Sequence, residues 1–339
     1  MSIKKVAKMA GVSIATVSRF FNNPSLVKHV TREKVERASK HLNYRPNTLA
    51  QNFRRGKTGI ILLVVYSISD PLDENFSRTV TQIAQSKGYD VLIKETNHQT
   101  LNAEYYRDIL NSKQADGLIV MIDLPRLDKT TQLALNQLPI IFIKGEAIAT
   151  GLSKQYIGLD NYAAAQTATN HLIDLGHQTI ACITTDINNT SSACRNAGFL
   201  LSMKKAKLAS PQVISLSTNT RSMANTIKTL LLSSPKVTAI FCTSDDLAID
   251  ALSELKQQNI RIPDELSIIG FDNIRYAAKT SPALSTIELP LNDIAQQAIK
   301  TLFTIINDDN YPIAPRTDST EVTFRHRIIL RSSTAKPYI

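Results

Sequence analysis

The first forty residues alternate apolar and polar positions with the 3.6-residue period of amphipathic helices. A short helix is expected from Ile3, with Val6 on its apolar face, and Gly11 then permits a sharp turn. Ser13 can cap a second helix, which turns Val17 back onto the first. Two short helices joined by a tight turn are typical of the helix-turn-helix motif, whose second helix docks in a DNA major groove.

A third helix is expected after a polar break at residues 22–24. Thr31 is predicted as its cap, and Val35 and Leu42 continue the apolar stripe that closes a small three-helix core. Leu26 and Val30, in the loop before this helix, are expected to seal the loop onto that core.

Residues 46–58 connect this head to the rest of the chain. They can form one or two helical turns, too short to be stable alone in water. A marginal helix with a large apolar residue favours a hinge that folds on DNA. Leu49 would then meet its copy across a dimer axis, Phe53 would wedge into the minor groove, and Arg54 would bind phosphate. A plain flexible linker is the alternative interpretation.

From residue 59 onward, short apolar runs alternate with helical patterns. This alternation predicts βαβ units and parallel sheets covered on both faces, divided between two sheets. Expected strands are 60–66, 89–94, 117–122, 139–143, 179–184, 213–216, 237–242 and 266–271, and expected helices are 76–87, 102–112, 162–175, 193–207, 223–232 and 245–258.

Polar residues follow several of these strands, at the sheet edge where doubly wound folds bind ligands. Each one alone is more typical of a loop or helix cap than of a ligand contact, and Asp245 is predicted to act partly as a cap. The residues are Asp70, Asp160, Asn161, Arg195, Ser244, Asp245, Asp272 and Asn273.

Charge is distributed unevenly along the 339 residues, whose net charge is +10. Residues 1–60 hold 13 Lys and Arg against two Glu, whereas the remainder is almost neutral. A basic head on a neutral body is the electrostatic signature of a nucleic-acid-binding module.

Other classes of protein find little support in the sequence. No apolar run is long enough to span a membrane, and no signal-peptide pattern precedes the head, so a cytoplasmic location is expected. Three widely spaced cysteines form no CxxC pair, and the six histidines lack metal-ligand spacing. We find no catalytic or nucleotide-binding motif, and we expect neither enzymatic activity nor a cofactor or metal ion. A transporter's solute-binding protein would share the predicted core but would not need residues 1–57.

Motifs along the whole chain resemble the LacI/GalR family of bacterial transcription regulators, and the core is most similar to its purine and cytidine repressor branch. The motifs are VAKMAGVS (6–13), ATVSR (15–19), TREKV (31–35), LNYRPN (42–47), ADGLIV (115–120), LGH (175–177), PDELSIIGFDN (263–273) and SPALSTI (281–287).

The resemblance implies an α/β architecture: a helix-turn-helix head at 1–45, a hinge at 46–58, and a periplasmic-binding-protein-like core at 59–339. The core would comprise two Rossmann-like lobes, lobe 1 from about 59–157 and 290–318 and lobe 2 from about 160–287 and 321–333. Three crossovers near 157–160, 287–290 and 318–322 would join them. A helix at 292–306 would belong to lobe 1, and a strand at 321–330 to lobe 2.

The resemblance also assigns residues that contact an operator. Ile14, Ala15 and Arg19 fall on positions that read base edges, and Arg19 suits a bidentate contact with guanine. Phe53 stands where the family usually has a leucine wedge. Further DNA contacts are expected from Thr16, Ser18, Asn22, Tyr44, Asn47, Leu49 and Arg54.

In the cleft between the lobes, the resemblance implies a small-molecule effector, a sugar or a nucleoside. Two aromatic positions common in base-binding relatives are Leu72 and Asp73 here, so base stacking loses its usual platforms. The implied contacts are Asp70, Leu72, Asp73, Asp160, Arg195, Ser244 and Asp272.

Together these features predict a sequence-specific transcriptional regulator, a repressor, that binds a pseudo-palindromic operator as a homodimer under effector control. The alternative is a regulator without an effector response, acting constitutively or through a protein partner. The sequence leaves open whether an effector would release or recruit DNA.

Overall fold

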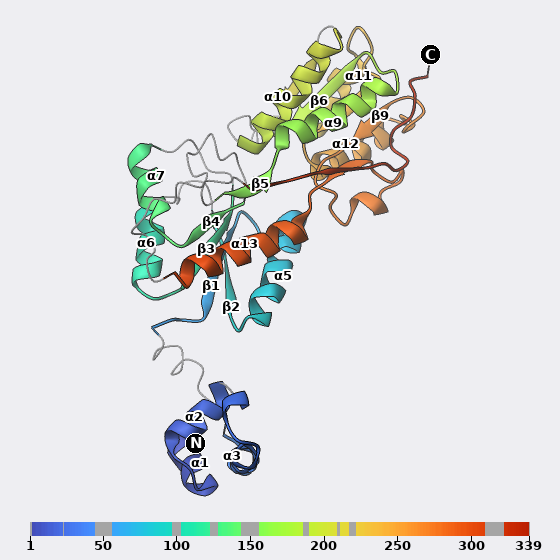
Figure 1. The fold of residues 1–339 in the computed structure, drawn as a ribbon. Helices are drawn as coiled ribbons and strands as arrows, with labels where there is room; N and C mark the ends of the chain where they lie inside the picture. Colours follow the sequence, from blue (N-terminus) through green and yellow to red (C-terminus); the bar gives the residue numbers. More distant parts are fainter. Residues whose placement is uncertain are drawn as a thin grey trace. The chain divides into compact units, whose positions relative to one another are not determined.

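The computed structural model describes residues 2–22, 24–44, 56–96, 103–122, 128–143, 156–185, 190–208, 211–216, 222–308 and 322–338. The chain divides into two compact units, Met1–Gly59 and Ile60–Ile339. The first is a helical head, and the second is an α/β core built from two lobes (Figure 1).

Three helices enclose a single apolar cluster in the head. Gly11 follows the first helix with a φ of 65°, the left-handed conformation that glycine adopts without strain, and so makes the predicted tight turn. Val6, Val17 and Val35, one from each helix, are fully buried. The elements are α1 (Ile3–Ala10), α2 (Ile14–Asn22), a 3₁₀ turn (Pro24–Leu26) and α3 (His29–His41).

The loop before α3 differs from the expectation in two respects. The helix begins three residues earlier than predicted, with Lys28 in the N-cap position, so Thr31 is not its cap. Leu26 and Val30 are 68% and 65% exposed, and Val27 closes the loop onto the core instead. Arg32 fixes this loop, because its Nη2 donates to the Pro24 carbonyl at 2.7 Å.

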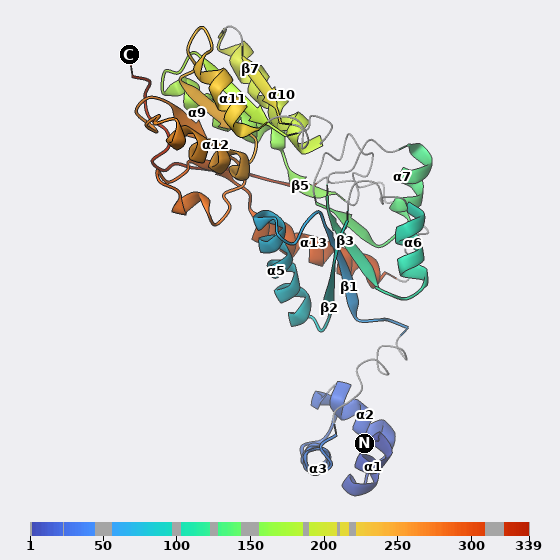
Figure 2. The same cartoon turned by 180° about the vertical axis from the view of Figure 1, so that it is seen from behind.

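Lobe 1 is built on a parallel sheet with the strand order β2-β1-β3-β4. Helices α5 and α13 cover one face and α6 and α7 the other (Figures 1 and 2). The central strands are buried, whereas edge strand β2 is largely exposed. The elements are β1 (Ile60–Val65), α5 (Pro71–Ser86), β2 (Asp90–Glu95), α6 (Ala103–Asn111), β3 (Gly117–Met121), α7 (Lys129–Asn136), β4 (Ile140–Phe142) and α13 (Leu291–Ile306).

Lobe 2 repeats this arrangement with the parallel order β7-β6-β8-β9. Helices α9 and α10 pack on one face, and α11 and α12 on the other. The elements are α9 (Asn161–Asp174), β6 (Ile180–Thr184), α10 (Thr190–Lys205), β7 (Gln212–Ser215), α11 (Met223–Leu231), β8 (Ala239–Cys242), α12 (Asp245–Gln257) and β9 (Ser267–Ile269).

Short strands carry the chain between the lobes. Ile157 packs in a lobe 1 cluster and Leu159 in a lobe 2 cluster, so the first crossover lies where the resemblance placed it. The single strand expected at 321–330 is wrong: β11 pairs with β5, whereas β12 pairs antiparallel with β10 in lobe 2. The strands are β5 (Ile157–Leu159), β10 (Thr286–Glu288), β11 (Val322–Phe324) and β12 (Arg327–Ile329).

The segment after β12 is fixed along lobe 2 by two histidines. His177 Nε2 donates to the Ala335 carbonyl at 2.9 Å, and its Nδ1 lies 3.0 Å from the Thr238 hydroxyl. His171 Nε2 lies 3.1 Å from the Thr334 hydroxyl. These histidines therefore have structural partners, as expected for core and helix-end positions.

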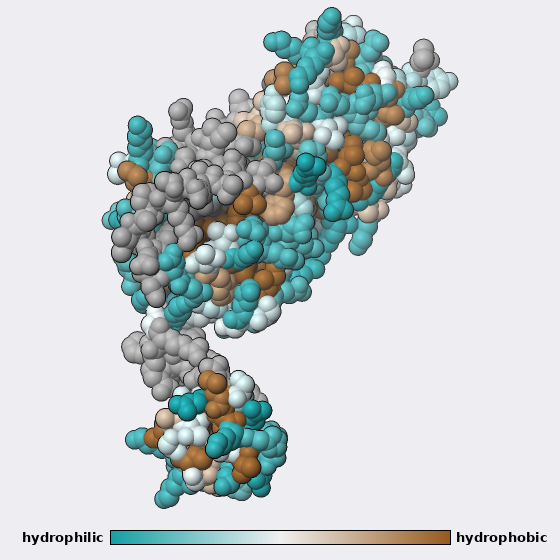
Figure 3. All heavy atoms as spheres, viewed as in Figure 1, coloured by the Kyte–Doolittle hydropathy of each residue, from teal (hydrophilic) through white to brown (hydrophobic). Residues whose placement is uncertain are grey.

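The face of the core seen in Figure 3 is of mixed polarity. Hydrophilic and apolar residues are interspersed over the core face shown in Figure 3. Within the described ranges, no helix combines the length and apolar character needed to cross a membrane.

Candidate functional sites

One face of helix α2 is exposed. Ile14 is 42% exposed, and Ala15 and Arg19 are also exposed. Ser13 starts this helix as predicted, because its Oγ accepts a hydrogen bond from the Thr16 N–H at 3.1 Å. The three residues predicted to read base edges therefore share an accessible helix face.

The residues predicted to contact the DNA backbone are placed less uniformly. Thr16 and Ser18 are half-buried, and the Thr16 hydroxyl lies 2.9 Å from the Ser13 hydroxyl. Tyr44 is also half-buried, with its ring 5.7 Å from that of Phe21. The Asn22 side chain and residues Asn47, Leu49, Phe53 and Arg54 lie outside the described residues.

The carboxyl edge of the lobe 2 sheet brings Arg195 and Asp272 together. Arg195 Nη1 lies 3.2 Å from Asp272 Oδ1, and the two side chains are only 11% and 9% exposed. The arginine is also held by Asn161 Oδ1, which accepts from Nε at 2.9 Å, and by the Thr243 carbonyl, which accepts from Nη1 at 2.6 Å. Its guanidinium carbon lies 3.8 Å from the centre of the Phe271 ring. We call Arg195 and Asp272 the lobe 2 clamp.

Two polar residues beside the clamp begin helices. Asp160 caps α9 by accepting from the Ala163 N–H at 2.8 Å, and Ser244 caps α12 by accepting from the Leu247 N–H at 3.3 Å. The prediction that Asp245 contributes to capping is wrong, because this residue is completely buried and bonds to other elements. The sequence did not indicate the role of the Thr243 carbonyl, since backbone acceptors carry no residue signature.

In lobe 1, the two predicted effector residues with carboxylates accept hydrogen bonds from nearby backbone N–H groups. Asp70 caps α5 by accepting from the Leu72 and Asp73 N–H groups. The Asp73 carboxylate is completely buried and accepts from the N–H groups of Tyr66 and Ser67. Leu72 is 8% exposed and packs in the lobe 1 core. Leu72 and Asp73 therefore have structural roles in lobe 1.

Comparisons with known proteins agree with this architecture. A family model for bacterial regulatory proteins of the lacI family matches residues 2–47, and a periplasmic binding protein-like domain matches residues 169–326. The transcriptional repressor CytR of Escherichia coli is 33% identical over 303 residues, which cover 89% of this chain and 88% of that protein. The chain belongs to the LacI family.

Two further relatives extend this similarity. The ribose operon repressor of Haemophilus influenzae is 32% identical over 91% of this chain and 93% of its own length. The Lac repressor dimer, crystallised with operator and the anti-inducer ONPF, matches with a TM-score of 0.83 at 22% identity, covering 99% of both chains. The fold is therefore shared from the head to the end of the core. The chain is a DNA-binding transcriptional regulator of this family.

The two lobes of this LacI-family core also meet through charged side chains. The loop after β9 carries Arg275, whose Nη2 lies 3.3 Å from Glu74 Oε2 on α5. Burial, and next the charge of Asp70 in lobe 1, raise the pKa of Asp246 in lobe 2. Acidic groups from both lobes therefore face the same region.

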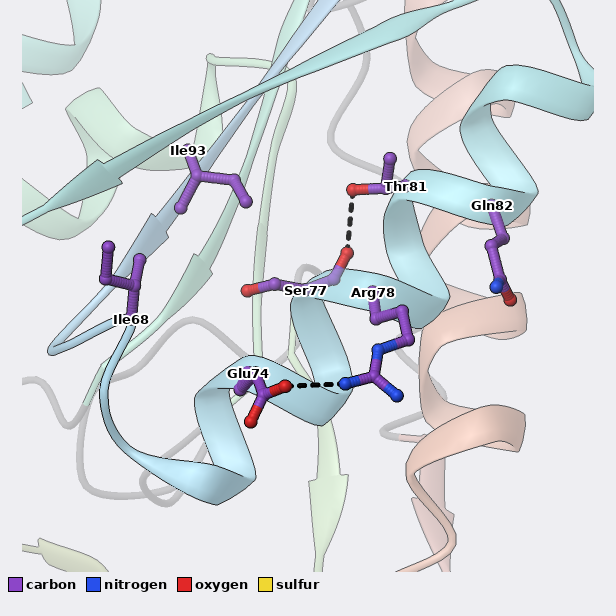
Figure 4. A pocket seen from close by; sticks show the side chains of 7 residues that line it. All are labelled: Ile68, Glu74, Ser77, Arg78, Thr81, Gln82 and Ile93. Carbon is purple, nitrogen blue, oxygen red and sulfur yellow. Dashed lines mark hydrogen bonds and ion pairs between the residues drawn. The ribbon is translucent and has the colours of Figure 1, made fainter.

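A separate hollow of about 280 Å³ lies on the outer side of lobe 1, between α5 and the loop and edge strand beside it (Figure 4). None of its lining residues belongs to the lobe 2 clamp, so we do not assign the effector to it. Ile68 and Ile93 supply its apolar wall and are 55% and 40% exposed. The lining residues are Ile68, Glu74, Ser77, Arg78, Thr81, Gln82 and Ile93.

Two further observations concern metal-binding and thiol groups among the residues that the structure describes. Over the residues that the structure describes, no group of three or more His, Cys, Asp or Glu side chains is arranged to hold a metal ion. Burial raises the pKa of the Cys182 and Cys242 thiols well above the ordinary value, so both remain protonated.

Proposed function

We propose that this LacI-family chain is a repressor that binds a pseudo-palindromic operator as a homodimer and responds to a sugar or nucleoside effector. The observation that carries this proposal is the exposed face of α2, on a head joined to a two-lobed core with a buried charged clamp. Such a regulator would act in the cytoplasm, where the chromosomal DNA is.

In the head, Ile14, Ala15 and Arg19 read base edges in this proposal. The Arg19 guanidinium suits guanine O6 and N7, and the Ala15 methyl suits a thymine methyl. The half-buried Ser18 and Tyr44 contribute contacts to the DNA backbone, which fix the position of the helix without reading sequence. Thr16, Asn22, Asn47, Leu49, Phe53 and Arg54 complete the proposed DNA contacts.

In the core, Arg195 and Asp272 provide the directed contacts to the effector. A guanidinium donates and a carboxylate accepts, so an adjacent pair of them matches the neighbouring hydroxyls of a sugar or a ribose. Asp160 and Ser244, each at the start of a helix, offer further polar contacts at the edge of the cleft. Asp70, whose carboxylate already caps α5, offers the weakest of these contacts. Leu72 in the core and Asp73 beneath a loop leave this part of lobe 1 without a stacking ring.

The hollow on lobe 1 is the surface that we assign to dimer formation. Beside it, edge strand β2 exposes Leu92 and Ile93, and an exposed apolar edge strand is a surface that proteins usually cover. A second copy of the chain would cover it and pair the two cores.

A second candidate function is regulation without an effector. The internal contacts of Arg195 favour it, because Nε and Nη1 already have partners within the protein. A clamp satisfied in this way holds the loop after β9 without any ligand.

Selection of DNA from a random pool tests the proposal. The purified full chain would be used with and without a mixture of nucleosides and sugars, and Arg19→Ala would be selected in parallel. A palindrome whose enrichment changes with the mixture supports an effector-gated regulator, and a palindrome that ignores the mixture supports the second candidate. Arg19→Ala should relax one position in each half-site, by about 1–3 kcal/mol. Failure to enrich any sequence would overturn both.

A further inference from the structure

Asp245 is a buried carboxylic acid that the proposed contacts with DNA and effector leave without a role. Its backbone N–H donates to the Phe271 carbonyl at 2.7 Å. Its Oδ2 accepts from the Ile274 N–H at 2.9 Å, and its Oδ1 accepts from the Thr286 hydroxyl at 2.6 Å. The bonds to Phe271 and Ile274 hold the loop after β9 on either side of Asp272. We call these two bonds the bracket.

The bracketed loop has an unfavourable backbone. Asp272 has a φ of 111° and Asn273 a φ of 51°, and side chains other than glycine rarely adopt such values. Strained residues of this kind persist only where their surroundings hold them firmly. Asn273 is held as well: its N–H donates to the Thr286 hydroxyl, its Oδ1 accepts from Arg331 Nη2, and its Nδ2 donates to Glu288.

The Asp245 side chain is closely packed on the sides of Gly270 and Thr286. Gly270, the residue just before this loop, lies so close to Asp245 that a Cβ at position 270 would overlap the Asp245 carboxylate. Thr286, on β10, is also completely buried. The carboxyl group and the loop therefore fit together as one unit, and neither can shift without moving the other.

We propose that Asp245 is a positioning residue of the lobe 2 clamp, which holds Asp272 toward Arg195 through the Ile274 N–H and the Thr286 hydroxyl. The inference rests on the proposed role of Arg195 and Asp272 in effector binding. The geometry that carries it is independent of that role, because Asp245 fixes the loop whether or not a ligand is present.

The charges around Asp245 are consistent with this role. Burial, and next the charge of Asp272, raise the pKa of Asp245 to about 8, and Arg331 acts in the opposite direction. Cys242, the other titratable group that interacts with Asp245, is itself protonated. The protonated form of Asp245 is therefore favoured beside Asp272 more than it would be in an exposed carboxyl group.

Two substitutions of Thr286 separate a hydrogen-bonding role from a packing role. Thr286→Val keeps the volume but loses the hydroxyl, whereas Thr286→Ser keeps the hydroxyl and loses a methyl group. Thr169→Val is the matched control, because Thr169 is equally buried in the same lobe but donates only within α9, to Ala165. Asp245→Asn keeps an acceptor for the Ile274 N–H, whereas Asp245→Ala removes this half of the bracket.

The first measurement is amide hydrogen exchange of the full chain in the segment 271–276. Thr286→Val should speed exchange there at least about tenfold, because it loses the buried bond to Asp245 and also the acceptor of the Asn273 N–H, and Asp245→Ala should speed it too. Thr286→Ser, Asp245→Asn and Thr169→Val should remain close to the unsubstituted chain. Unchanged exchange in Thr286→Val, or equal effects of valine and serine, would overturn the proposal.

The second measurement is calorimetric binding of D-ribose and of cytidine, the probes chosen here. If either binds the unsubstituted chain, Thr286→Val should bind it about tenfold more weakly and Thr286→Ser should bind it normally. Equal binding by Thr286→Val, despite faster exchange, would show that the bracket does not serve the clamp. If neither probe binds, the proposed sugar or nucleoside effector fails for these classes, and the exchange measurement still decides whether Asp245 positions the loop.

Discussion

Lobe 1 and lobe 2 share the same strand order, yet they use the side chains at the carboxyl edges of their sheets differently. In lobe 1, Asp70 and Asp73 accept hydrogen bonds from nearby backbone N–H groups and so complete a turn and a helix start. In lobe 2, Arg195 and Asp272 bond to each other, and Arg195 also bonds to Asn161 on α9 and to the Thr243 carbonyl after β8. The same sheet edge is therefore occupied by carboxylates that hold the backbone in lobe 1, and by the charged clamp in lobe 2.

This difference indicates where ligand discrimination resides. A backbone cap uses the acceptors of a carboxylate locally, and a ligand can gain little from it. A nearly buried ion pair joins side chains from separate elements. A ligand that binds to this pair can therefore change how those elements pack together. We therefore expect substitutions in lobe 2 to change effector binding, and matched substitutions in lobe 1 to change stability.

The largest expected effect comes from breaking the clamp. Arg195→Leu removes the cation that faces the nearly buried Asp272 carboxylate, and with it the proposed donor to the effector. Binding of an active sugar or nucleoside should weaken about 100-fold, or about 3 kcal/mol, in a calorimetric titration. Arg107→Leu, on exposed α6 surface of lobe 1, is the control and should bind normally. Equal binding by both variants would contradict the division between the lobes.

The reverse result is expected for Asp73 in lobe 1. Asp73→Ala leaves the Tyr66 and Ser67 N–H groups without their carboxylate acceptor, at a cost of about 2–3 kcal/mol in the free energy of unfolding. Urea denaturation would measure this loss, and Asp73→Asn, which retains one acceptor oxygen, should lose less. A stable Asp73→Ala variant with impaired effector binding would return Asp73 to the effector site.

The lobes should also differ in their response to pH. Burial raises the pKa of Asp245 to about 8, whereas in an unfolded chain it would be near 3.8. Between these values the folded state retains a proton that the unfolded state has released, so the free energy of unfolding falls as pH rises. The slope approaches about 1.4 kcal/mol per pH unit for one proton. Urea denaturation at several pH values between 6.5 and 8 would measure it, and Asp245→Asn should remove this contribution.

The histidines of lobe 2 act in the opposite direction and set the lower limit of that window. Burial lowers the pKa of His171 and His177, so below their ordinary value of 6.5 the unfolded state binds protons more readily than the folded state. Their contribution to stability is therefore lost as pH falls, and the difference between the unsubstituted chain and Asp245→Asn at each pH separates the Asp245 contribution from theirs. An identical slope in Asp245→Asn would show that its proton does not differ between the two states.

Most of the core's regular elements could be predicted from the sequence, because buried parallel strands appear as short apolar runs. The run at 60–66 became β1, and its end shifted by a single residue. Helix α7 was missed, since its short and mostly polar sequence has a weak apolar period. The strand expected at 321–330 divided in two, because the chain passes between lobes at residues that local patterning does not distinguish from a strand.

The candidate site could be predicted only in part, for reasons that Ser244 and Asp245 illustrate. Both residues are good helix caps, and the choice between them depends on where the first helical turn begins. The structure gives the cap to Ser244 and buries Asp245 against Thr286 on a strand 41 positions later. Contacts of this range have no local signal, so the sequence identified the clamp residues but not the groups that hold them.

The smallest expected effects compare the caps of the two lobes. Asp70→Ala and Asp160→Ala each remove a side-chain acceptor at a helix start, and each should lower the free energy of unfolding by about 1 kcal/mol. Asparagine at either position should restore most of this stability, since it is an equally good cap.

The two sites should differ in effector binding, because Asp160 shares the edge of lobe 2 with the clamp. Calorimetry should show weaker effector binding for Asp160→Ala and a change of no more than about threefold for Asp70→Ala, the spread expected from ordinary context effects. If Asp70→Ala weakened binding as strongly as Asp160→Ala, the lobe 1 edge would take part in ligand recognition directly, and the contrast between a structural and a ligand-binding edge would not hold.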